Sequence, residues 1–184
     1  MTPDEVGTRL GGTATMSGGG DHARVTVDVP VADWVTAVQR ARDELGYDFF
    51  DWLSAVDELD QGFTVVTHLW SVARREGVLL RTAVPREAPA APSIVAVYPG
   101  AAWYERETHE MFGIDFPGHP GGLRPLLLPP EFEGYPLRKE FVLAARVAKI
   151  WPGAKEPGES ESGAAKRTRM RPPGVPAPGE WGPE

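Results

Sequence analysis

The sequence predicts an α+β fold: a mixed or antiparallel sheet with helices packed on it, followed by an extended Pro/Gly-rich C-terminal segment. Three observations support this prediction. Residues 49–84 contain three runs rich in β-branched and aromatic residues, separated by short turns, which is typical of a strand meander. Apolar residues recur at helical spacing on both sides of that region. Beyond residue 117, prolines are too frequent for regular helices or strands.

The 184 residues divide into four parts by composition. Residues 1–22, rich in Gly, Ser and Thr, predict a flexible N-terminal lead. Residues 23–116 predict the α+β domain, and residues 117–141 predict an ordered, extended segment. Residues 142–184 predict a tail that lies along a partner chain.

The first part of the domain predicts one strand and one helix. The run ARVTVDV at 23–29 alternates apolar and polar residues, as a short strand does. After Pro30, apolar residues at helical spacing predict a helix. Gly46 stands where it can end this helix. We expect the buried face of the helix to hold Trp34, Val38, Ala41 and Leu45.

A meander of three strands follows this helix. The strands are predicted within residues 49–59, 63–73 and 78–84. The turn between the first two contains Gly62, which can adopt a positive φ without steric cost.

A second helix is predicted beyond a proline-rich loop at 85–92. It runs from about Ala101 to Phe112, and Gly113 occupies the position that caps a helix C-terminus. The residues expected to face the sheet are those at i, i+4 and i+7, namely Tyr104, Thr108 and Met111.

Charge and composition exclude several classes of function. A net charge of −7 argues against general nucleic-acid binding. No apolar run approaches the ~20 residues needed to span a bilayer, and the N-terminus lacks the pattern of a signal peptide. The chain contains no cysteine, which excludes disulfides, cysteine nucleophiles and all-cysteine iron–sulfur clusters. The redox centres of any electron-transfer system would therefore lie on other chains.

The run ERETHEMFGIDFPGHP at 105–120 concentrates the candidate functional residues. A metal site would use Glu105 and His109 from one helix face, with His119 from the following loop. The alternative is an outer helix face with ion pairs between residues four apart, as in Arg106 and Glu110. HEMFG does not match the H-E-x-x-H metal motif. A catalytic pair of Glu105 and Glu107 is disfavoured, because residues two apart on a helix diverge by about 200°.

The tail differs from the rest of the chain in charge and composition. Residues 142–184 carry 7 basic and 5 acidic residues, a net of +2, against −9 for residues 1–141. From Pro152 onward, Pro and Gly are frequent and no periodic apolar pattern remains, which is typical of disorder. Trp151, Trp181 and the basic run at 166–171 are spaced anchors, which also suits a tail that lies along a partner.

Two blocks of the sequence resemble a known family. WYERETHEMFGIDFPGHP (103–120) and EGYPLRKEF (133–141) are similar to the signature of the C subunit of the proton-pumping NADH:quinone oxidoreductase, bacterial respiratory complex I. Two stretches of the tail, at 148–160 and 171–183, resemble actinobacterial members. The residues that match the signature are Trp103, Glu105, Arg106, Glu107, Phe112, Gly113, Phe116, Gly118, His119, Pro120, Leu123, Arg124, Gly134, Pro136, Arg138 and Lys139.

This resemblance implies a structural subunit of the hydrophilic arm of the complex, with no catalytic, cofactor-binding or metal-binding residue in this chain. NADH, FMN, the iron–sulfur clusters and quinone would be bound by partner subunits. The implied neighbours are the large quinone-site subunit and the adjacent iron–sulfur subunit. The chain would then be peripheral, on the cytoplasmic side of the cell membrane, and associated with the membrane only through the complex.

The signature residues would form an interface and an internal brace. Arg106, Arg124 and Arg138 could each recognise a carboxylate through two hydrogen bonds. The sequence departs from the family pattern at His109 and Glu110, where an aromatic residue followed by Asp is usual. It also carries one extra residue in the loop GGLRP, and Pro125 stands where a second Arg is common.

Two other functions remain open from the sequence. One is the equivalent subunit of a related F420H2 dehydrogenase or membrane-bound hydrogenase, because the electron-donor site would lie on another chain in each case. The other is a free-standing metal-dependent hydrolase that uses Glu105, His109 and His119.

Overall fold

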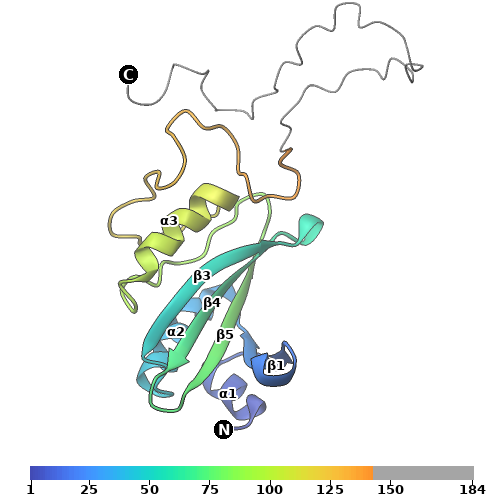
Figure 1. Cartoon of the computed structure of the whole chain (residues 1–184), viewed down its shortest axis with the longest axis vertical. Coiled ribbons are helices and arrows are strands. Elements are labelled where there is room, and N and C mark those ends of the chain that lie inside the picture. The colour runs from blue at the N-terminus through green and yellow to red at the C-terminus, as the bar shows by residue number, and fades with distance from the viewer. Residues whose placement is uncertain (143–184) are drawn as a thin grey trace, which may run out of the picture.

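A five-stranded mixed sheet in the order β1-β2-β5-β4-β3 forms the centre of the computed structural model, which describes residues 1–142 (Figure 1). β2 and β5 are parallel, and the other neighbouring strands are antiparallel. This arrangement confirms the predicted α+β class with a mixed sheet. The strands are β1 (Thr13–Ser17), β2 (Arg24–Asp28), β3 (Phe49–Asp57), β4 (Phe63–Ser71) and β5 (Glu76–Val84).

Three α-helices contribute to one hydrophobic core against one face of this sheet. They are α1 (Pro3–Leu10), α2 (Trp34–Asp43) and α3 (Ala101–Phe112), and three short 3₁₀ turns lie at Gly20–His22, Val31–Asp33 and Leu59–Gln61. Within residues 1–142, no helix is long and apolar enough to cross a membrane.

The burial of β4 shows which side of the sheet the helices cover. Val65, Thr67 and Leu69 are fully buried on the helix side, whereas His68 and Trp70 on the opposite face are partly exposed. This alternation is the period of two that a half-covered strand requires. The predicted meander is confirmed, since β3, β4 and β5 pair in sequence and Gly62 adopts a φ of 98° in the first turn.

The prediction of a flexible N-terminal lead is wrong. Residues 3–10 form α1, and Thr2 and Glu5 close a capping box at its first turn. Val6 and Leu10 from α1 enter the core, and β1 pairs with β2 as an edge strand. The frequent glycines concealed these features, although the Thr-Pro-Asp-Glu start carried the capping signal.

The predicted helix after Pro30 is confirmed. Its expected inward residues are all buried, and Gly46 beyond it adopts a φ of 64°. Trp34 is fully buried at the first position of α2, where it joins the core cluster.

The chain after α3 continues to Val142 without further helix or strand and passes back along α3 (Figure 1). An isolated parallel β-bridge joins Asp115 of this segment to Ala90. The predicted partner-binding tail begins at Val142, the last described residue, so that prediction falls outside the described residues.

Candidate interaction surface

Glu105 is the most deeply buried charged residue of α3, with none of its surface exposed. Of the residues expected to face the sheet, Thr108 is buried, while Tyr104 and Met111 are only partly buried and pack against the edge of the core. The inward face is therefore rotated toward Glu105. The helical spacing indicated an amphipathic helix, but a rule that buries apolar residues does not select a glutamate for the core.

The Glu105 carboxyl holds the segment that precedes α3. Its Oε1 accepts a hydrogen bond of 2.7 Å from the N–H of Ile94, whereas Oε2 is buried without a hydrogen-bond partner in the described structure. Burial raises the pKa of Glu105, and the Ser93 hydroxyl, the Ile94 N–H and the nearby His119 oppose that rise. No solvent reaches this carboxyl, and its one hydrogen bond to a backbone group braces the chain at Ile94.

The two histidines of the metal hypothesis bond to different backbone groups. His109 Nδ1 lies 3.0 Å from the carbonyl of Ile114. His119 Nε2 lies 3.1 Å from the carbonyl of Ala102, while its Nδ1 accepts from the N–H of Gly121 at 3.3 Å. Among residues 1–142, no group of three His, Asp or Glu side chains is close enough to hold a metal ion. The hydrolase alternative has no geometric support in this region.

Arg106 and Glu110 do not form the helix ion pair that their spacing suggested. Arg106 donates to the carbonyls of Arg124 and Pro125 at 3.0 and 2.7 Å. The Glu110 carboxylate accepts from three consecutive backbone N–H groups, those of residues 126–128, at 2.8 to 3.0 Å. Both side chains thus hold the returning segment through its backbone. They satisfy polar groups that a segment without regular structure would otherwise leave unpaired.

Arg138 holds the same segment farther along. Its Nε donates to the carbonyl of Phe112 at 2.6 Å, and its guanidinium lies 4.3 Å from the centroid of the Tyr135 ring. Gly113 allows this close approach. It has a φ of 71°, and a Cβ there would lie 2.5 Å from the Tyr135 ring and 2.7 Å from Arg138. Any other residue would be strained twice, by its backbone conformation and by this contact.

Asp57 at the end of β3 fixes the far end of the segment. Its carboxylate is 3% exposed and accepts from Arg86 Nη1 at 2.8 Å, from the Lys139 N–H at 2.8 Å and from the Leu59 N–H at 2.9 Å. The Arg86 hydrogen bond, supported by these two N–H groups, outweighs burial and lowers the pKa of Asp57 to about 2. The contact with Leu59, two residues away, is ordinary turn chemistry for an aspartate. No local signal pointed to Arg86 or to Lys139, 82 positions away.

An apolar groove runs between α3 and the part of the segment that Glu110 holds. It has a volume of 390 Å³ and is lined by Gly100, Trp103, Tyr104, Glu107, Leu126 and Leu127. Trp103 is 66% exposed and Leu127 is 58% exposed. Exposed large apolar groups that gather in a groove are typical of an interaction site.

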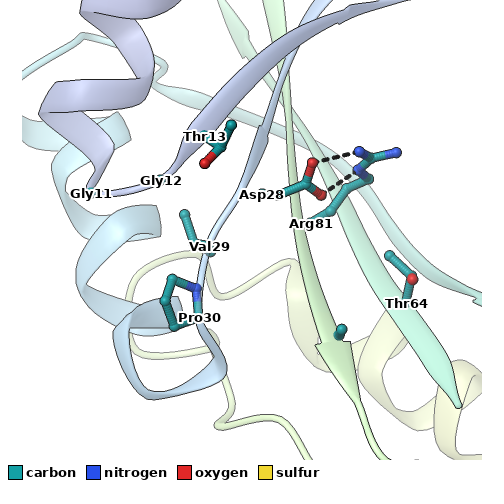
Figure 2. Close-up of a pocket in the computed structure, with 9 residues that line it drawn as sticks. Gly11, Gly12, Thr13, Asp28, Val29, Pro30, Thr64 and Arg81 are labelled. Atoms are coloured by element: carbon teal, nitrogen blue, oxygen red, sulfur yellow. Dashed lines mark hydrogen bonds and ion pairs between the residues drawn. The ribbon is translucent and has the colours of Figure 1, made fainter. Parts of the chain in front are cut away.

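A second pocket, of 690 Å³, lies where β2 and β5 are adjacent in the sheet (Figure 2). Its charged side chains, Asp28 and Arg81, pair through two hydrogen bonds of 2.8 and 2.6 Å. Because Asp28 and Arg81 pair with each other, neither charge is available to bind a charged ligand in this pocket. This pocket is separate from the groove beside α3. The two share no lining residue, and no residue of β3, the strand on which α3 packs, lines the second pocket.

Comparison with known proteins identifies the family. The family described as "Respiratory-chain NADH dehydrogenase, 30 Kd subunit" matches residues 27–147, about two thirds of the chain. The chain belongs to this family. Its matched region includes the signature blocks, α3 and the segment that α3 holds.

Two relatives of the chain illustrate the extent of the similarity. The C subunit of the NADH-quinone oxidoreductase of Roseiflexus castenholzii is 45% identical over 126 residues, which cover 67% of this chain and 70% of the relative. The C/D subunit of the NADH-quinone oxidoreductase of Methylococcus capsulatus is 42% identical over 139 residues. This match covers 69% of the chain but only 23% of that longer protein.

A solved structure shares the fold of this chain. A chain of the membrane-bound sulfane sulfur reductase, an archaeal respiratory membrane complex, superposes with a TM-score of 0.63 at 28% identity. The match covers 71% of this chain and 78% of that one. The same architecture therefore occurs in respiratory complexes with different names.

The other signature residues of this chain divide into internal and exposed groups. Phe112 and Phe116 are buried, whereas Pro120, Arg124 and Lys139 are exposed. Within residues 1–142, the Arg124 side chain has no carboxylate partner, and Arg106 bonds to carbonyls instead. Within the described residues, Arg106 therefore makes no two-point contact with a carboxylate, and carboxylate recognition at a partner surface stays a prediction.

Proposed function

We propose that this chain is a structural subunit of the hydrophilic arm of NADH:quinone oxidoreductase, respiratory complex I. In the proposed complex, electrons pass from NADH through FMN and iron–sulfur centres on other chains to a quinone, coupled to proton translocation. This chain supplies no catalytic residue. It lies at the cytoplasmic side of the cell membrane and is held there by its partner subunits.

The proposal rests above all on what the signature side chains do within a chain of the 30 kDa family. Arg106 and Arg138, together with Glu110, which is not part of the signature, bond to backbone groups and fix an exposed segment of defined shape, while Glu105 bonds to the buried backbone N–H of Ile94. A reaction site would instead leave such groups facing an accessible cavity. A fixed, exposed shape is what a permanent protein interface requires, because little entropy is then lost on docking.

The proposed partners are the large quinone-site subunit and the adjacent iron–sulfur subunit. The signature surface, defined here as α3 together with residues 117–141, docks against them. Residues 142–184 extend along the large subunit, with Trp151 and Trp181 as anchors. This tail carries +2, whereas residues 1–141 carry −9, so the two parts suit different surfaces.

The decisive experiment is purification of the complex from the native host through a tag on the full chain. We expect the large quinone-site subunit and the iron–sulfur subunits to co-purify in stoichiometric amounts, and the preparation to reduce a quinone with NADH. A tagged chain that purifies alone from mild detergent extracts would contradict the proposal. The same tag on a variant with a scrambled 143–184 sequence provides a matched control for the tail.

The tail has its own test within this assembly. Deletion of residues 152–184 is expected to leave the domain folded but to lower the yield of intact complex by ~10-fold, because aromatic and arginine anchors dominate such contacts. Normal yield and normal NADH oxidation after the deletion would contradict the proposed role of the tail.

A second candidate is the equivalent subunit of an F420H2 dehydrogenase or a membrane-bound hydrogenase. It is supported by the fold shared with the sulfane sulfur reductase complex. The electron donor separates the two candidates, since the purified complex would oxidise F420H2 or hydrogen instead of NADH.

A further inference from the structure

The groove beside Trp103 has walls that the chain holds rigidly. Leu126 and Leu127 form one wall, and their N–H groups are both fixed by the Glu110 carboxylate at 2.9 and 2.8 Å. Arg106 holds the two preceding carbonyls. Trp103 and Tyr104 form the other wall from α3, and Tyr104 is itself fixed by an edge-on contact with Phe50 at 5.4 Å. The groove is therefore preformed.

One unpaired charge lies in this apolar groove. Glu107 lines it and has neither a hydrogen bond nor an ion pair to any other residue of the described 1–142. Its neighbour one turn along α3, Glu110, is already engaged by backbone N–H groups. A carboxylate next to an exposed indole ring favours a planar cation, which can pair with the carboxylate and stack on the ring.

We propose that this groove docks an arginine-bearing segment of a neighbouring subunit, with the guanidinium between Glu107 and the Trp103 ring. Arginine fits better than lysine, because its planar group can pair with the carboxylate while lying over the indole. Leu126 and Leu127 then cover its aliphatic stem and an adjacent apolar side chain. The net charge of −9 over residues 1–141 complements a basic segment.

A neighbouring subunit is favoured over other occupants by continuity. The groove is part of the signature surface, since Trp103 and Glu107 belong to α3 and Leu126 and Leu127 to residues 117–141. This inference rests on the proposed function, because it requires a permanent partner at that surface. The competing occupants are the chain's own basic run at 166–171 and a second copy of the chain.

Charge reversal provides the first test, in the complex purified from the native host. Glu107→Lys is expected to lower the yield of intact complex by ~10-fold or more, and Trp103→Ala by a similar factor. Glu107→Gln, which removes the charge without reversing it, should lower it by only ~3-fold. The matched control is Glu87→Lys, the same change at an exposed glutamate outside the groove, with a yield within ~1.5-fold of wild type.

Crosslinking identifies the occupant directly. A photoreactive phenylalanine at position 103 should crosslink, in the intact complex, to a segment of another subunit with an arginine within four residues. Crosslinks to residues 143–184 of this chain, to a second copy or to a partner segment without arginine would overturn the inference. So would normal yields for both Glu107→Lys and Trp103→Ala.

The two failures can be told apart. If the wild-type chain co-purifies with no redox subunit, the proposed function fails, and the docking inference fails with it. If the wild type assembles fully and both Glu107→Lys and Trp103→Ala assemble equally well, only the docking inference is overturned. Unchanged thermal melting of each purified variant excludes misfolding as the cause of a lost complex.

Discussion

Helices α2 and α3 cover the same face of one sheet, but they differ in the polarity of the side chains that they bury. The buried face of α2 is entirely apolar, formed by Trp34, Ala37, Val38 and Ala41. α3 buries Glu105 and Thr108 in addition to Ala101 and Phe112, and its Arg106 and Glu110 bond to backbone carbonyl and N–H groups of a neighbouring segment.

This difference separates two tasks. Apolar burial at α2 stabilises the domain as a whole, at about 25 cal/mol for each Å² removed from water. The hydrogen bonds of α3 have small net free energies, but their directions are specific. They give a segment without regular secondary structure one defined shape. We therefore expect substitutions at α2 to unfold the domain and substitutions around α3 to change the shape of the signature surface.

The largest effect is expected at Trp34, which has no exposed surface. Trp34→Ala should lower the free energy of unfolding by about 3–5 kcal/mol, since it leaves a large cavity in the core. Urea denaturation of the full chain, followed by far-UV circular dichroism, measures this change.

Two variants control for this effect. Thr36→Ala, at an exposed position of α2, should change stability by less than about 0.5 kcal/mol. Trp34→Phe should cost less than Trp34→Ala, because it keeps most of the volume and removes an indole N–H that has no partner. A loss at Trp34→Ala smaller than at any position around α3 would break the contrast between the helices.

Asp57 is expected to give the next largest effect and the clearest pH dependence. Its pKa of about 2 in the folded state lies below the ordinary value of 3.8, so its contribution is complete above pH 4. That contribution is lost as pH falls from about 4 toward 2, where the folded-state carboxylate is protonated. Asp57→Asn should therefore lower stability by about 2–3 kcal/mol at pH 7, because Arg86 loses its buried partner.

Urea denaturation from pH 7 to pH 2.5 tests this prediction. The gap between wild type and Asp57→Asn should narrow as the pH falls through that window. Asp60→Asn, at an exposed position of the same hairpin tip, is the control and should follow the wild-type curve. A gap that stays constant with pH would assign the loss to packing rather than to the carboxylate.

Gly113 tests how much stability depends on the close packing of Tyr135 and Arg138 against the end of α3. Gly113→Ala should lower stability by about 1–2 kcal/mol, because the φ of 71° disfavours any side chain. It should also displace Tyr135 and Arg138, which a Cβ would meet at 2.5 and 2.7 Å. Gly100→Ala, at a φ of −62° with its nearest contact at 3.5 Å, should be nearly neutral. Equal losses at the two glycines would remove this distinction.

The same contrast explains how far the sequence predicts this molecule. α2, the meander and the extent of α3 follow from apolar periodicity and turn residues, which are local signals. Glu105, Glu110 and Asp57 were misjudged or left without a role, because their partners lie 11 to 82 positions away. A charged residue on a helix gives no indication of whether it meets solvent, a side chain or a distant N–H group. The family resemblance marked the residues that matter, but their bonding became visible only in the structure.

The smallest effect on global stability, and the sharpest test of the contrast, is expected at Glu110. Glu110→Ala frees the N–H groups of residues 126–128. Because this segment can open without unfolding the domain, the free energy of unfolding should fall by less than about 1 kcal/mol. Hydrogen exchange at those three amides should nevertheless accelerate by ~10-fold or more.

Glu107→Ala, three positions earlier on α3, is the matched control and should leave that exchange unchanged, since Glu107 has no partner in residues 1–142. If both variants accelerated exchange equally, the helix as a whole would hold the segment, and the specific role of the Glu110 carboxylate would be lost.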